Sequence, residues 1–515
     1  MKTVVVIGAG PAGLTAAYQI LLQSKDTKVI VLEQDMLVGG ISKTAEQNGN
    51  RMDLGGHRFF TKSKEVRQIW ENLLTLQGVP IAETIEHPQK SQYPGAGDPN
   101  TSDNVMLLRR RISRIYYNEC FFDYPVTVSW ETLKKLGFAK SFKCAVGYFI
   151  ACIWKRKGSS LEDFYINRFG KPLYELFFKD YTTKLWGVSP AELDSSWGAQ
   201  RVKKLSLTKV ILDFIGRTFN KNYQTKDTSL IEEFYYPKFG PGQMWQAMSR
   251  RIETMGGELC LNTVCQGVLC RNQQVYAVKV TTADGRQEQI ACDYVISSMP
   301  IKELLEKLDA PVPREVSSIA RELPYRDFIT VGILVDKLAL QNETAFPTLQ
   351  NIPPDCWIYV QDSSVKMGRI QLFNNWSPFL LADPKKTVWL GLEYFCHEAD
   401  TFWNMSDEAI KNLAVEELRK MKLLSDGQVL QGVVLRQKKA YPAYFGAYQN
   451  FNIVKDYLLS FSNLLCVGRN GQHRYNNMDH SMITGIRAAQ CVNGQADAAI
   501  LWDVNTDQEY HEEEE

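Results

Sequence analysis

The chain has 515 residues, of which 44% are hydrophobic and 23% charged, and its formal net charge is +1. This is the composition of an ordinary globular protein that is long enough for two or three domains around a large core. A charge so close to zero argues against a nucleic-acid partner. The eleven cysteines include no C-x-x-C pair, so we expect neither a metal site nor a disulfide framework, but reduced thiols in the cytoplasm.

A dinucleotide-binding unit stands first in the chain. An apolar strand at 4–7 leads into a glycine-rich turn, and a second apolar strand ends at Glu33. Gly8 permits the tight turn, Gly10 lets the backbone approach a pyrophosphate, and Gly13 lets the next helix pack closely on the sheet. The pyrophosphate then lies at a helix N-terminus, and Glu33 accepts a hydrogen bond from a ribose hydroxyl. The pattern predicts a cofactor with an ADP moiety held by Gly8, Gly10, Pro11, Ala12, Gly13 and Glu33.

Two more glycine pairs follow, Gly39-Gly40 and Gly55-Gly56, the second directly before His57. This pattern resembles the FAD superfamily of amine oxidases, protoporphyrinogen oxidase, carotene desaturases and UDP-galactopyranose mutases. The resemblance implies FAD, with further contacts near the C-terminus, where an apolar strand ends in a glycine turn and a helix begins at 479. That helix N-terminus is placed to stabilise negative charge on a reduced flavin. The additional cofactor residues are Gly40, Gly55, Gly56, His57, Val264, Gly468, Arg469, Asp479, Ser481 and Met482.

The resemblance implies an α/β fold. We expect an interleaved, GR2-like Rossmann-type FAD-binding domain, a helical domain and a substrate-facing antiparallel sheet domain. A polar stretch rich in Pro, Gly, Asn and Asp predicts an exposed insertion, and the terminal glutamates predict a solvated tail. We expect the FAD-binding domain to comprise 1–75, 234–300 and 464–500, with a strand over 257–264. We expect the helical domain over 108–230, with its best helices at 161–178 and 206–219, and the sheet domain over 301–445. The insertion is expected at 81–107 and the tail at 501–515.

A basic apolar segment interrupts the helical region. The apolar run 144–154 follows Lys134, Lys135, Lys140 and Lys143 and precedes the basic triplet 155–157. It is too short to span about 30 Å of hydrocarbon as a helix, so we expect no transmembrane segment. The commoner explanation is a core-facing helix with solvated lysines, and the alternative is peripheral contact with an anionic membrane. No signal peptide precedes the first strand, which favours the cytoplasm.

Later blocks look like UDP-galactopyranose mutases, especially the longer eukaryotic-type members. These blocks are 181–186, 197–202, 357–359, 368–378, 440–444 and 474–477, and the resemblance covers about 1–75 and 108–500. It implies that Arg201 and Arg369 grip the pyrophosphate of a nucleotide sugar, as a planar guanidinium can. It further implies phosphate contacts from Tyr441 and Tyr475, sugar contacts from Trp186 and Trp357, a nucleotide contact from Tyr359, a substrate-binding Asn477, and His57 beside flavin N5.

The implied activity is that of a pyranose–furanose mutase, a redox-neutral isomerase acting on a nucleotide-diphosphate sugar such as UDP-galactopyranose. Reduced FAD attacks the anomeric carbon through N5, the diphosphate leaves, and the sugar recloses as a furanose from the flavin–sugar adduct. NAD(P)H is the expected reductant. The catalytic residues are then His57, Arg201 and Arg369.

Departures from the mutase pattern keep an alternative open. Thr182 stands where eukaryotic-type mutases have asparagine, and Trp376 stands where they have tyrosine, so the sugar and nucleotide are undetermined. The alternative is an FAD-dependent oxidoreductase of the protoporphyrinogen oxidase, amine oxidase or carotenoid desaturase type, acting on an apolar substrate. A mutase requires Arg201 and Arg369 to converge on one diphosphate, whereas arginines aimed at carboxylates favour the oxidoreductase.

Overall fold

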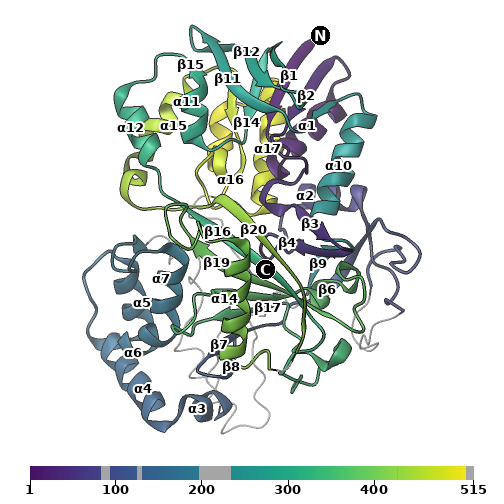
Figure 1. Cartoon of the computed structure of the whole chain (residues 1–515). Coiled ribbons are helices and arrows are strands. Elements are labelled where there is room, and N and C mark those ends of the chain that lie inside the picture. The colour runs from purple at the N-terminus through teal and green to yellow at the C-terminus, as the bar shows by residue number, and fades with distance from the viewer. Residues whose placement is uncertain (83–92, 125–129, 196–232, 426, 506–515) are drawn as a thin grey trace.

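The computed structural model describes residues 1–82, 93–124, 130–195, 233–425 and 427–505 (Figure 1). A five-stranded parallel sheet lies in the half of the molecule that contains the N-terminus. Its central strands are runs of Val, Ile and Leu buried on both faces, as parallel sheets require. The strand order is β10 (Glu258–Cys260), β2 (Thr27–Leu32), β1 (Lys2–Ile7), β14 (Tyr294–Ser297) and β21 (Leu464–Cys466).

Three helices from distant parts of the chain pack together beside this sheet. The helix α1 (Pro11–Gln23) contacts both α17 (Met478–Val492) and α10 (Gly242–Thr254). The same hydrophobic core continues into a second, four-stranded sheet. The parallel strands therefore come from both ends of the chain. The second sheet contains β13 (Gln287–Ala291), β12 (Gln274–Thr281), β11 (Val264–Arg271) and β15 (Leu308–Asp309).

A seven-stranded sheet forms the second half of the molecule, with the helix α14 (Asp407–Lys420) packed on it. The sheet is antiparallel except where β17 runs parallel to β7. Two small sheets lie beside it, β3 (Thr44–Gln47) with β4 (Asn50–Asp53), and β5 (Thr75–Leu76) with β6 (Val105–Arg110) and β9 (Glu233–Pro237). The order of the large sheet is β20 (Val429–Pro442), β16 (Tyr325–Val335), β19 (Val388–Cys396), β18 (Arg369–Leu372), β17 (Trp357–Val360), β7 (Ser113–Tyr117) and β8 (Cys120–Asp123).

Helices α3 to α7 form a lobe at the end of the molecule away from β1 (Figure 1). The helix predicted over 161–178 is broken, because Gly170 at φ 80° ends one segment and begins the next. The helix predicted over 206–219 lies outside the described residues. The helices are α3 (Trp130–Leu136), α4 (Phe138–Ile153), α5 (Leu161–Phe169), α6 (Lys171–Tyr174) and α7 (Asp180–Trp186).

Several other predictions differ from the structure in local detail. The strand predicted over 257–264 is two strands separated by a turn with Asn262 at φ 49°. The end of the predicted insertion is buried, since Val105 and Leu107 belong to β6. Trp502 is also buried, within the predicted tail. The predicted helical region begins with strands β7 and β8, which join the large sheet.

The α4 helix contradicts the expectation of a core-facing segment. Its bulky apolar residues are exposed, Phe138 to 88% and Phe149 to 66% of their surface. Only small residues of α4, Cys144 and Ala151, are buried. In the part of the chain that the structure describes, no single helix is long and apolar enough to cross a membrane; α3 and α4 reach that length and composition only together, across a 110° bend.

Candidate active site

The turn between β1 and α1 is shaped by glycines, of which Gly13 leaves no room for a side chain. A Cβ on Gly13 would stand 2.0 Å from the carbonyl oxygen of Gly8, so the helix can approach the turn only with glycine there. Gly10 lies opposite Gly40, and a Cβ on Gly40 would stand 3.5 Å from the Cα of Gly10. The N-terminus of α1 carries Pro11 at its first position. Free backbone N–H groups therefore point into the cavity, where they suit a pyrophosphate.

Glu33 sets one end of this cavity. One of its carboxylate oxygens accepts from the N–H of Ala9 at 2.7 Å, and the other accepts from that of Asp35 at 2.9 Å. Burial raises the pKa of Glu33, although both backbone donors oppose that shift. Each oxygen keeps a second lone pair for a ribose hydroxyl. The backbone of Thr263, next to Val264, donates to the carbonyl of Glu33 at 2.8 Å, which places the β10–β11 turn beside it.

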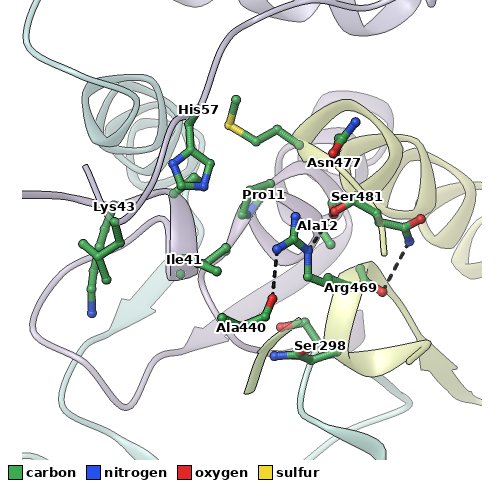
Figure 2. Close-up of a pocket in the computed structure, with 18 of the residues that line it drawn as sticks. Pro11, Ala12, Ile41, Lys43, His57, Ser298, Ala440, Arg469, Asn477 and Ser481 are labelled. Atoms are coloured by element: carbon green, nitrogen blue, oxygen red, sulfur yellow. Dashed lines mark hydrogen bonds between the residues drawn. The ribbon is translucent and has the colours of Figure 1, made fainter. Parts of the chain in front are cut away.

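His57 also lines this cavity (Figure 2). Its Nδ1 lies 3.1 Å from the carbonyl oxygen of Gly55, which can only accept, so Nδ1 carries the proton. Burial lowers the pKa of His57 to about 3, and the positive charge of Arg469 adds to this effect. The imidazole is therefore neutral at physiological pH, with Nε2 as a hydrogen-bond acceptor.

The C-terminal segment completes the cofactor side. Gly468 has φ 75°, and a Cβ there would meet the side chain of Ala12 at 2.9 Å. Arg469 is fixed by donating to the carbonyls of Asn476 and Ala440, both at 2.9 Å (Figure 2). The helix α17 begins directly afterwards, with its N-terminus at the cavity. This cradle of glycines, an acid and two helix N-termini fits the ADP moiety and ring of FAD.

Arg369, on β18, lines the other half of the cavity. Its Nε lies 3.4 Å from a carboxylate oxygen of Glu393, which is fully buried on β19. Burial alone would lower the pKa of Arg369, but the Glu393 charge raises it above its usual range. Gln371 holds the other Glu393 oxygen at 2.6 Å. Of the two predicted arginines, Arg369 thus reaches the cavity while facing a carboxylate, and Arg201 lies outside the described residues.

Aromatic rings surround Arg369. The rings of Tyr441 and Tyr475 stack with centroids 5.6 Å apart and planes 14° apart. Trp357 and Tyr359 meet edge to face at 6.5 Å on the neighbouring strand β17. All four line the cavity. They supply three phenol hydroxyls and flat surfaces of the kind that bind phosphates, sugars and bases.

Most of the predicted residues meet at one cavity of about 1370 Å³. Three of the described ones do not line it. Trp186 is buried in a core cluster with Leu185, Gly13 packs against the Gly8 turn, and Met482 lies in the core, accepting from the indole N–H of Trp70. Those on the wall are Gly8, Gly10, Pro11, Ala12, Glu33, Gly40, Gly55, Gly56, His57, Val264, Trp357, Tyr359, Arg369, Tyr441, Gly468, Arg469, Tyr475, Asn477, Asp479 and Ser481.

Sequence reasoning missed several basic residues on the wall. Arg111 lies 5.7 Å from the ring of Trp357; it belongs to a run of three arginines at 109–111, which was the available signal. Among the described residues, nine basic side chains line the cavity against four acidic ones, although the whole chain is almost neutral. This excess favours anionic ligands. The basic residues are Lys43, Arg58, Lys62, Arg111, Lys307, Arg369, Lys438, Lys439 and Arg469.

Sequence relatives of the chain are named as L-amino acid oxidases or as an inactive reductase. An inactive all-trans-retinol 13,14-reductase of Danio rerio is 24% identical over 327 residues, 60% of this chain and 49% of that protein. An L-amino acid oxidase of Crotalus durissus cumanensis is 30% identical over 130 residues, 25% of this chain and 23% of that protein. The chain thus spans about half or less of the length of these relatives.

Solved structures share the fold over nearly the whole chain. A reduced UDP-galactopyranose mutase superposes with a TM-score of 0.76 at 21% identity, covering 99% of this chain and 97% of that one. A putrescine oxidase bound to putrescine gives 0.58 at 15% identity, covering 96% and 99%. At such identities these likenesses show the fold alone. The family model for flavin containing amine oxidoreductases matches residues 11–493, and the chain therefore belongs to that family of flavoenzymes.

Proposed function

We propose that this flavoenzyme is a pyranose–furanose mutase acting on a nucleotide-diphosphate sugar. The observation that carries the proposal is the wall formed by Arg369, the stacked Tyr441 and Tyr475, and the rings of Trp357 and Tyr359. A guanidinium and phenol hydroxyls match diphosphate oxygens, and the rings match a sugar and a base. An apolar substrate would offer these polar groups no complementary atoms.

The residues of this chain assist the bound flavin in this reaction. Bound reduced flavin supplies the nucleophile for the anomeric carbon, so the ring form changes without net oxidation. Arg369 and the two tyrosines stabilise the nucleoside diphosphate as its bond to the anomeric carbon breaks, and hold it until the bond re-forms. Neutral His57 offers Nε2 as an acceptor where the Gly55–Gly56 backbone approaches the flavin ring. We propose Arg201 as a second diphosphate ligand.

The decisive experiment is isomerisation of UDP-galactopyranose by the protein reduced anaerobically with dithionite, followed by chromatography of the nucleotide sugars. We expect the furanose isomer with reduced protein only, the oxidised protein being the control. A flavin spectrum perturbed by UDP without isomerisation would point to another sugar. No product and no response to UDP would contradict the proposal. Anaerobic bleaching of the flavin by NADH or NADPH tests the proposed reductant.

One observation favours a second candidate, an oxidoreductase. The buried Glu393 already supplies a counter-charge to Arg369, so Arg369 can be accommodated without an anionic ligand. The test is anaerobic reduction of the oxidised flavin by a porphyrinogen or an amine. Rapid bleaching by either, together with no isomerisation of nucleotide sugars, would replace the mutase with this activity.

A further inference from the structure

The largest exposed apolar surface of the described chain lies far from the cavity. Eight of its seventeen large exposed hydrophobic side chains come from residues 130–154, in α3, α4 and the residue that follows. Both helices lie at the end of the molecule opposite β1 (Figure 1). Monomeric proteins rarely expose so many neighbouring bulky apolar groups without a partner. The eight are Trp130, Phe138, Phe142, Val146, Phe149, Ile150, Ile153 and Trp154.

The α4 helix is amphipathic with its bulky side outward. At 3.6 residues per turn, five exposed residues of α4 fall within an arc of about 80°. We call this set the apolar face of α4; it consists of Phe138, Phe142, Val146, Phe149 and Ile153.

The opposite side of α4 carries small residues and packs on the protein. Cys144 and Ala151 are buried there. Between them lies Gly147, where a Cβ would stand 2.3 Å from the ring of Pro172 on α6. Only a helix side made of small residues fits this contact. The helix therefore cannot rotate to bury its phenylalanines, and the fold itself fixes the exposure of the apolar face.

Positive charge surrounds this apolar face. Residues 130–160 contain seven lysines and arginines and one carboxylate, Glu131. This segment thus carries six net positive charges in a chain whose total is +1. Lys134, Lys143 and Lys157 have no carboxylate partner among the residues that the structure describes. An apolar strip flanked by unneutralised lysines is complementary to an anionic lipid surface.

The dimensions of α4 favour a position in the plane of the membrane. Its sixteen residues span about 24 Å, less than the hydrocarbon thickness of about 30 Å. Lys143 is exposed beside the apolar face, where it can reach headgroups while the phenylalanines enter the acyl region. Trp154 follows the last residue of α4 and Trp130 begins α3, and tryptophan prefers the headgroup level.

We infer that α3 and α4 dock this enzyme peripherally on an anionic membrane surface, through insertion of the apolar face of α4 and attraction of the surrounding lysines. The inference does not depend on the reaction at the flavin. It replaces the core-facing interpretation of this segment, which the exposure of Phe142 and Phe149 contradicts.

The test is cosedimentation of the full-length holoprotein with vesicles of phosphatidylcholine alone and of phosphatidylcholine with phosphatidylserine in equal amounts. We expect binding to the mixed vesicles that weakens with salt. Phe142→Ser with Phe149→Ser keeps every charge and should weaken binding by about tenfold or more. Lys134→Glu with Lys143→Glu keeps the apolar face and should abolish the preference for phosphatidylserine.

The matched control is Leu22→Ser, which removes another exposed apolar side chain, near the end of α1 and outside α3 and α4; it should bind like the unaltered protein. Flavin content of each variant reports an intact fold. Equal binding by the Phe142→Ser, Phe149→Ser variant, or no binding to mixed vesicles, would overturn the inference. So would a dimer, detected by sedimentation without vesicles, that this variant abolishes, because a second copy would then cover the face.

Discussion

At the scale of single residues, Arg369 has a structural counterpart in the same sheet. Arg114 on β7 pairs with the buried Asp355, and its side chain is 18% exposed, as is that of Arg369. Only Arg369 lines the cavity. Comparing the two arginines therefore distinguishes an arginine that only forms an ion pair from one that can also bind a ligand.

We expect Arg114→Lys to lose more stability than Arg369→Lys, because Arg114 donates three hydrogen bonds to Asp355, whereas Arg369 only approaches Glu393 at 3.4 Å. Only Arg369→Lys should weaken UDP binding, by about tenfold or more, because lysine cannot grip a diphosphate bidentately. Flavin-monitored titration with UDP and urea unfolding measure the two effects. Equal UDP affinity in both variants would remove Arg369 from the site.

Asp53 is a second residue with a measurable signature. It is fully buried, accepts hydrogen bonds from Tyr236 and Thr44, and burial raises its pKa to about 8. The folded protein therefore keeps a proton that the unfolded chain has released above its ordinary pKa of 3.8. The stability that this proton supplies is complete below pH 4 and is lost as the pH rises towards 8.

Asp53→Asn keeps the shape of the side chain without an ionisable group. Its free energy of unfolding, relative to the unaltered protein, should rise with pH by at most about 1.4 kcal/mol per unit between pH 4 and 8, and then level off. Urea unfolding at several pH values measures this difference. A difference that stays constant with pH would mean that Asp53 ionises normally in the folded protein.

At the scale of elements, the β1–α1 turn determines cofactor loading. We expect Gly13→Ala to purify with little flavin, because its new Cβ would collide with the carbonyl of Gly8 and displace α1 from the turn. Gly267→Ala in β11 is the control, since its Cβ would meet no atom closer than 3.7 Å. The ratio of flavin to protein absorbance reports the result. Full flavin in Gly13→Ala would show that the turn tolerates displacement.

How far sequence predicts an element depends on how local its signal is. The roles of Gly13 and Glu33 could be predicted because strand, turn, helix and acid lie within about thirty residues of one supersecondary unit. The exposure of α4 could not be predicted, because its outward side is decided by Pro172, which leaves room only for glycine. Trp186 does not line the cavity, and the sequence could not indicate this, because an aromatic residue gives the same pattern on a core wall and on a cavity wall.

At the scale of the whole molecule, the cavity joins two halves built on different sheets. The parallel sheet contributes the cradle around Gly8 and Glu33, and the seven-stranded sheet contributes Trp357 and Arg369. The family and the fold follow from motifs in the first half. The substrate depends on side-chain directions in the second half, and the contact of Arg369 with Glu393 is a tertiary fact that no motif contains.

The late position of β21 in the chain has a consequence for biosynthesis. The parallel sheet stays incomplete on the ribosome until Cys466 has been made, because β21 pairs with β14 and α17 follows it. Until then the growing polypeptide exposes the unpaired edge of β14, which is a template for aggregation. Cofactor capture therefore follows the synthesis of β21, and we expect a premature stop codon upstream of β21 to remove flavin binding, however much of the chain has been translated.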